Sequence, residues 1–133
     1  MKLRVARHTD DLEKIKSFYI DILGFSLLGS FENHDNYDGI FIGKPDLDWH
    51  FEFTKSDEKP NHHFDEDDIL VLYPEEINEY NLLINNLLNN NISIITSKNS
   101  YWNNPVPTTS GSGGKMFLDP DGFRIIISNL KAK

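Results

Sequence analysis

The sequence contains no cysteine, and this absence excludes disulfide bonds, thiolate metal sites and a cysteine nucleophile. It also lacks any apolar run near the roughly 20 residues that a helix needs to span a bilayer. The first eight residues, Met-Lys-Leu-Arg-Val-Ala-Arg-His, lack the apolar segment of a signal peptide. We therefore expect a cytoplasmic protein that does not enter a membrane.

Basic residues are scarce, with 13 Lys and Arg against 21 Asp and Glu, for a net charge of −8. Such a chain would be repelled by phosphates, so nucleic acid is not an expected partner. The segment Ser56–Asp68 holds six acids and one lysine, and so contributes −5 of this total. The acidity belongs mainly to this segment, and it does not decide whether a ligand would be cationic or anionic.

The 133 residues fit a single domain, whose first half shows a strand, a helix and three further strands. Alternation predicts a strand over 3–7, and Asp10 with Glu13 resembles a capping box that would open a helix. Apolar residues at helical spacing follow, and Gly24 is suited to end the helix. The predicted strands lie at 26–32, 39–43 and 49–55, with turns at 33–38 and 43–45.

The second half repeats this order. Residues 69–73 form an apolar run typical of a buried strand, and Pro74 suits the first position of a helix. The apolar face of that helix would hold Ile77, Tyr80, Ile84, Leu87 and Leu88, and the run 89–91 of asparagines would end it. Strands are predicted at 92–96, 115–118 and 123–128, with a type I turn over 119–122 that makes the last two a hairpin.

Both halves thus read as strand, helix and three strands. The predicted fold class is α+β, with two βαβββ modules paired around a central cleft. The first module covers 1–55, an acidic linker covers 56–68, and the second module covers 69–133.

Three segments resemble the vicinal oxygen chelate superfamily, which includes glyoxalase I, bleomycin resistance proteins, fosfomycin-resistance enzymes and extradiol dioxygenases. They are 11–25, with Phe18-Tyr19 and Leu23-Gly24-Phe25; 50–54, with His50-Phe-Glu52-Phe-Thr54; and 119–122, Asp-Pro-Asp-Gly. The stretch from Tyr37 to Thr54, together with Tyr101-Trp102, is similar to the YycE-like subgroup. The resemblance implies paired βαβββ modules, a homodimer and, in the enzymes, a divalent metal held by His or Glu.

The positions that the resemblance assigns to metal ligands are Arg4, Glu52, a residue near Asp68 or Ile69, and Ile126. Arg and Ile do not coordinate metals, so Glu52 is the one firm carboxylate. We therefore expect no tightly bound metal or other cofactor, although a labile divalent metal remains an alternative.

Strand alternation places Arg4, Ala6 and His8 on the cleft face of the first strand, with Leu3 and Val5 toward the helix. It likewise places His50, Glu52 and Thr54 on the cleft face, and Arg124, Ile126 and Ser128 in the second module. Arg4 would pair with Glu52, either to recognise a polar or anionic ligand group or as a structural ion pair. Glu52 is also a candidate general base.

His8 and His50 with Glu52 make a set of two imidazoles and one carboxylate, which on paper resembles a facial triad. We favour the interpretation that these are unrelated polar residues. If a metal does bind, they are its candidate ligands.

The long stretch 97–115 holds Tyr101, Trp102 and several glycines and prolines. Long loops in small domains are often functional, so this one could be a flap whose Trp102 stacks on a ligand. The alternative is a surface loop whose Trp fills a crevice.

Together these features predict a small-molecule-binding protein of the glyoxalase and bleomycin resistance type, without a tightly bound metal. The ligand-binding candidates are Arg4, His50, Glu52, Trp102, Arg124 and Ile126. One alternative is a metal-dependent glyoxalase-like lyase or dioxygenase that uses Glu52. A second is a homodimeric interaction module without a ligand.

Overall fold

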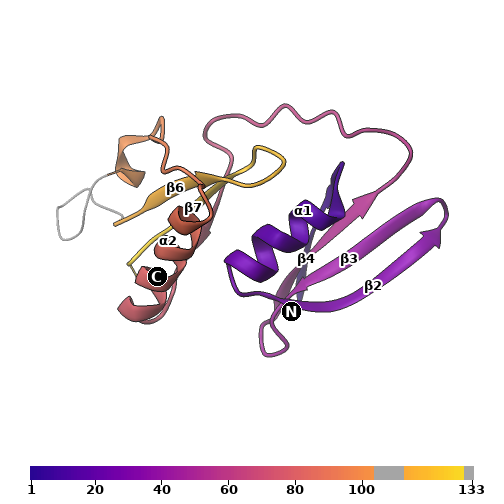
Figure 1. Ribbon diagram of the computed structural model, residues 1–133, viewed down its shortest axis with the longest axis horizontal. Helices are drawn as coiled ribbons and strands as arrows, with labels where there is room; N and C mark the ends of the chain where they lie inside the picture. Colours follow the sequence, from indigo (N-terminus) through magenta and orange to yellow (C-terminus); the bar gives the residue numbers. More distant parts are fainter. Residues whose placement is uncertain (104–112, 131–133) are drawn as a thin grey trace. The chain divides into compact units, whose positions relative to one another are not determined.

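The computed structural model describes residues 1–103 and 113–130. The chain divides into two compact units, with the boundary between His62 and His63. The first unit contains β1 (Leu3–His8), a helix, β2 (Ser26–His34), β3 (Tyr37–Gly43) and β4 (Trp49–Lys55). The second contains β5 (Ile69–Leu72), α2 (Ile77–Asn89), the 3₁₀ turn η2 (Ser100–Trp102), β6 (Lys115–Leu118) and β7 (Arg124–Ile127) (Figure 1).

The first sheet has the strand order β1-β4-β3-β2, in which β1 runs parallel to β4 and the other neighbours are antiparallel. The β2–β3 hairpin is tighter than the predicted turn over 33–38. Asp35 and Asn36 both have positive φ (51° and 70°), the backbone pattern of a two-residue type I′ turn. Asp and Asn tolerate this conformation, which explains why the strands extend to His34 and Tyr37.

The first helix begins one residue later than the capping box predicts. Asp11, not Asp10, is the N-cap, and its carboxylate accepts hydrogen bonds from the backbone N–H groups of Glu13 and Lys14 at 3.0 and 3.1 Å. The regular α-helix α1 covers Leu12–Lys16 and continues as the π-helical segment η1 (Ser17–Ile22). Gly24 follows with φ of 81°, which confirms it as the residue that ends the helix.

Aromatic packing attaches this helix to the first sheet. The ring centroid of Tyr19 lies 5.5 Å from that of Phe51 and 5.1 Å from that of Phe53. Ile15, Phe18 and Tyr19 are buried with these two residues, as the helical spacing predicts. The alternation of β4 is therefore confirmed: Phe51 and Phe53 face the helix, and Glu52 points to the other face.

Leu3 and Val5 depart from the prediction. Their register partners are Trp49 and Phe51, so they point to the predicted face of the sheet, yet they are 59% and 42% exposed. The reason is their position on β1, which forms the edge of this sheet, whereas the helix lies over β4.

The second unit repeats this topology with one strand fewer. Its sheet has the order β5-β7-β6, with β5 parallel to β7 and β6 antiparallel to it. The predicted strand at 92–96 is reduced to a single bridge between Ile95 and Met116. The predicted β6–β7 hairpin is confirmed: the Gly122 N–H donates to the Asp119 carbonyl at 2.9 Å, and the Asp119 side chain accepts from Asp121 and Phe123.

Helix α2 begins at Ile77 rather than at Pro74, because residues 75 and 76 form a bend before it. Its buried face consists of Tyr80, Leu83, Ile84 and Leu87, which follow the spacing i, i+3, i+4, i+7. Ile77 and Leu88, which the prediction also assigned to this face, lie at the first and the penultimate residue of the helix and are 57% and 44% exposed. The helix ends at Asn89, and Asn91 beyond it has φ of 61°, so the asparagine run ends the helix as predicted.

Both units thus pack one main helix on a sheet whose first and last strands are parallel neighbours. This confirms the α+β fold class with repeated modules. Across residues 1–103 and 113–130, no helix combines the length and the apolar content needed to cross a bilayer.

Candidate functional site

The face of the first sheet away from its helix carries a cluster of four side chains, Arg4, Phe41, His50 and Glu52, here called the Arg4 cluster. The strand register explains its composition. Arg4 of β1 is the partner of His50 on β4, and Glu52, two residues further along β4, is the partner of Phe41 on β3. Residues paired in this way project to the same face of a sheet, so the cluster follows directly from the pairing of three strands.

Arg4 is the centre of this cluster. Its Nε donates a hydrogen bond to His50 Nε2 at 3.0 Å, and its Nη1 lies 3.8 Å from Glu52 Oε2. The predicted pairing of Arg4 with Glu52 is therefore present. The Glu52 side chain is 17% exposed and that of Arg4 is 52% exposed, so the carboxylate is partly withdrawn from water beneath a more open guanidinium.

The bond from Arg4 occupies one ring nitrogen of His50. A guanidinium has only donors, so His50 Nε2 accepts this hydrogen bond with its lone pair, and Nδ1 is the ring nitrogen that remains.

An aromatic surface continues the cluster. The Arg4 Cζ lies 4.8 Å from the centroid of the Phe41 ring, within the range of a cation–π contact. The Phe41 ring in turn lies 5.8 Å from that of Phe31 on β2. A Cβ at Gly39 would come within 2.2 Å of the Phe31 ring, so this ring lies directly against the β3 backbone, and only glycine leaves room for it.

His8 does not join His50 and Glu52. It pairs with Thr54, four residues along the sheet from the pair formed by Arg4 and His50, which corresponds to about 13 Å. His8 instead contacts Ser56, with 3.0 Å between Nε2 and Oγ, and its carbonyl lies 2.6 Å from His62 Nε2. The structure therefore brings two of the three candidate metal ligands together and leaves the third apart.

The divalent metal that the superfamily's enzymes use does not fit these residues. A guanidinium, which cannot coordinate a cation, stands at the first ligand position and occupies the Nε2 lone pair of His50. Ile126, at the last position, offers only hydrocarbon and is fully buried. Within the part of the chain that the structure describes, no group of three or more His, Asp or Glu residues is arranged to hold a metal.

The remaining candidates lie in the second unit. Arg124 is held within its own unit: Nη2 lies 3.9 Å from Glu66 Oε1, and Nη1 donates to the Asp65 carbonyl at 3.4 Å. Sequence reasoning missed this contact, which joins part of the acidic linker to β7. Phe64 joins the same region, with its ring 4.8 Å from that of Phe123.

Trp102 ends the 3₁₀ turn η2 and packs edge-on against Tyr101 at 5.0 Å. The turn is closed by Asn103, whose side chain accepts from the Ser97 N–H at 2.8 Å and donates to the Ser97 carbonyl at 2.9 Å. The beginning of the predicted flap is thus a hydrogen-bonded turn. The proline- and glycine-containing part at 104–112 lies outside the described residues.

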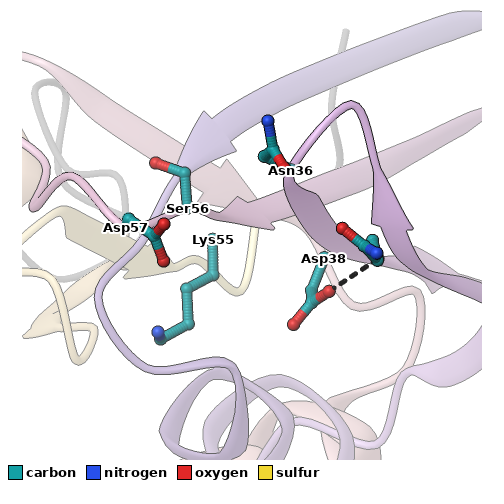
Figure 2. Close-up of a pocket in the computed structure, with 6 residues that line it drawn as sticks. Asn36, Asp38, Lys55, Ser56 and Asp57 are labelled. Carbon is teal, nitrogen blue, oxygen red and sulfur yellow. Dashed lines mark hydrogen bonds between the residues drawn. The ribbon is translucent and has the colours of Figure 1, made fainter.

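A polar hollow of about 290 Å³, which the sequence did not reveal, lies at the hairpin end of the first unit (Figure 2). Asp38 and Lys55 are cross-strand partners there, and the Asp38 carboxylate accepts the N–H of Asn33 at 2.9 Å. The other residues that line it are Asn36, Ser56 and Asp57. It shares no lining residue with the Arg4 cluster and contains charges of both signs.

Fold and sequence comparisons agree on the class of protein. The duplicated modules place the chain in the vicinal oxygen chelate superfamily, the class of the glyoxalases and the fosfomycin and bleomycin resistance proteins. Within this class, the chain belongs to the YycE-like family: the YycE-like N-terminal domain matches residues 3–54, and the YycE-like C-terminal domain matches residues 67–129.

The YycE protein of Bacillus subtilis strain 168 is 34% identical over 133 residues, which cover 98% of this chain and 88% of that protein. Its crystal structure is similar to this one with a TM-score of 0.83 and 32% identity, covering 99% of this chain and 91% of that chain. This similarity confirms the family that the sequence resembles.

More distant structures share the fold. Glyoxalase I of Leishmania major, described as trypanothione-dependent, has a TM-score of 0.71 at 19% identity, covering 97% of this chain and 86% of its own. TnmS3 of Streptomyces sp. CB03234, described as an antibiotic binding protein, has a TM-score of 0.65 at 19% identity, covering 96% and 93%. At these identities the likeness concerns the fold.

Proposed function

We propose that this protein binds a small organic molecule through the Arg4 cluster, without a tightly held metal. The observation that carries this proposal is the contact of Arg4 with both His50 and Glu52. Arg4 and Glu52 stand at two of the positions where the resemblance to the superfamily implies metal ligands. The arrangement offers a half-exposed row of guanidinium donors next to a carboxylate acceptor. Both can engage polar groups of a ligand while the rings of Phe31 and Phe41 contact its apolar part.

Binding is a better supported role than catalysis. Glu52 could serve as a base, but proton abstraction next to a carbonyl requires an electrophile that stabilises the resulting enolate. The only cation in the cluster is Arg4, and its charge is offset by Glu52, the candidate base itself, 3.8 Å away, so it would supply only part of that stabilisation. The glyoxalase-like lyase or dioxygenase therefore stands as the alternative that the experiment below must test.

Native mass spectrometry of the protein as purified tests the proposal directly. We expect a mass that exceeds that of the chain by a small organic ligand, no stoichiometric metal and, as the superfamily resemblance implies, a homodimer. Binding of this ligand should be lost in Arg4→Ala and retained in Lys55→Ala, which changes a charge in the polar hollow.

A stoichiometric divalent metal, or turnover that a chelator abolishes, would instead support the enzyme. Failure of any added small molecule to bind would support the ligand-free interaction module.

A further inference from the structure

We infer that the ligand of the Arg4 cluster is uncharged, with a hydrogen-bond acceptor next to a donor on a flat apolar body, as in an aromatic carboxamide. This inference rests on the proposed function and specifies the chemical class of its ligand. It is derived from the charges, the unused hydrogen-bonding groups and the aromatic surface of the cluster.

The charges of the cluster cancel. Arg4 contributes +1 and Glu52 contributes −1, with 3.8 Å between the nearest nitrogen and oxygen. His50 contributes nothing because its Nε2 accepts a hydrogen bond from Arg4. An anion bound to Arg4 would therefore be repelled by Glu52, and a cation bound to Glu52 would be repelled by Arg4. A neutral ligand experiences neither repulsion.

The unused hydrogen-bonding groups of Arg4 and Glu52 are complementary to a ligand that carries an acceptor next to a donor. Arg4 uses its Nε–H on His50, and its Nη1 is too far from Glu52 Oε2 for a hydrogen bond, so its Nη donors are available. Among the residues that the structure describes, none donates a hydrogen bond to the Glu52 carboxylate. A carbonyl oxygen facing Arg4 and an N–H or O–H facing Glu52 would satisfy both at once.

The surface next to these groups is aromatic. The ring centroids of Phe31 and Phe41 lie 5.8 Å apart with the ring planes tilted by 49°, and the Phe31 ring rests directly against the backbone at Gly39. An aromatic ring system packs well on such a surface, because offset or edge-on ring contacts add to the burial of apolar area. The ligand body is therefore inferred to be planar and apolar.

Three naphthalene probes with the same ring system test this inference: the carboxamide, the carboxylate and the aminomethyl compound, which are neutral, anionic and cationic at neutral pH. Isothermal titration calorimetry should show that the wild type binds the carboxamide about tenfold more tightly than either ion. Glu52→Gln leaves Arg4 unbalanced and should make the carboxylate the preferred probe. Arg4→Gln should make the aminomethyl probe the preferred one.

Lys55→Gln is the matched control, because it removes one charge from the polar hollow and should leave the order of the probes unchanged. Misfolding of a variant would weaken all three probes together, so a change of order reports on charge alone. Wild type that prefers an ion, or an order that neither variant changes, would overturn the inference while leaving the binding function in place. If no probe binds and native mass spectrometry finds no ligand, both fail.

Discussion

Tyr80 is a residue whose hydroxyl links α2 to a distant part of its unit. The hydroxyl donates a hydrogen bond to the Gly113 carbonyl at 3.2 Å, and the residue is 8% exposed. Burial raises the pKa of Tyr80 above its ordinary value of 10.0 by disfavouring the phenolate. A raised pKa means that folding favours the protonated form, so its contribution to stability is complete below pH 10.0 and is lost as the pH rises through the folded-state pKa.

Tyr80→Phe should therefore destabilise the protein at neutral pH by about 1 kcal/mol, because the Gly113 carbonyl loses its donor. Urea unfolding of the two proteins at increasing pH measures this difference, which should shrink above pH 10.0 as the wild type loses stability. A stability difference between wild type and Tyr80→Phe that stays constant with pH would contradict the raised pKa of Tyr80.

Gly39 is the residue that admits the Phe31 ring. Since a Cβ at Gly39 would lie 2.2 Å from that ring, Gly39→Ala must displace the Phe31 ring and so disturb its packing on Phe41. We expect a loss of about 1 kcal/mol in the free energy of unfolding from this aromatic pair, measured by urea denaturation. Gly29→Ala is the control, because its Cβ would make an ordinary 3.4 Å contact with Phe41. Equal effects of the two substitutions would contradict this account.

Among the elements, the first helix depends on a single capping side chain. Asp11→Ala removes two hydrogen bonds to the first turn and should cost about 1 kcal/mol of stability in thermal or urea unfolding. Asp10→Ala changes an equally charged neighbour that is not the cap, and should have almost no effect. A larger loss of stability in Asp10→Ala than in Asp11→Ala would show that Asp10 is the N-cap, as the capping-box pattern predicts.

The type and order of the elements could be predicted, because periodic apolar residues and turn residues are local signals. Gly24 and the turn over 119–122 were located correctly for this reason. The π-helical continuation over Ser17–Ile22 could not be predicted, since its spacing resembles that of an α-helix over so few residues. The loss of the strand at 92–96 and the exposure of Leu3 and Val5 depend on which neighbours an element meets, which apolar periodicity does not encode.

The candidate site also combines features that local sequence patterns predict with features that depend on contacts between distant residues. Alternation on β1 and β4 correctly placed Arg4 and Glu52 on one face, and the contact between them is present. The bond from Arg4 to His50 and the ring of Phe41 beneath Arg4 were missed, because they depend on strand register and side-chain conformation. The engagement of Arg124 by the acidic linker was missed because long-range contacts leave no local pattern in a single sequence.

At the scale of the whole molecule, the two units repeat one topology with unequal completeness. In the first sheet β4 and β3 are flanked on both sides by partner strands, and in the second sheet β7 is. Hydrogen exchange followed by NMR should find the most slowly exchanging amides in these three strands. The Ile95 amide, which donates to the Met116 carbonyl, should exchange more slowly than its neighbours Ile94 and Thr96. Uniform slow exchange across 92–96 would indicate a complete fourth strand instead.

The hydrogen bond between Arg4 and His50 has an evolutionary consequence. If a guanidinium has replaced a metal ligand, a single amino-acid exchange separates this surface from a metal site. Arg4→His would release His50 Nε2 and add a second imidazole on the neighbouring strand, giving two histidines beside Glu52. Competition with a chromogenic chelator should then show Zn²⁺ binding at least about tenfold tighter than in Arg4→Gln, which releases His50 without adding a ligand. Equal Zn²⁺ affinity in the two variants would show that more than one exchange separates this surface from a metal site. The expected result would show that one exchange is enough to create metal binding here.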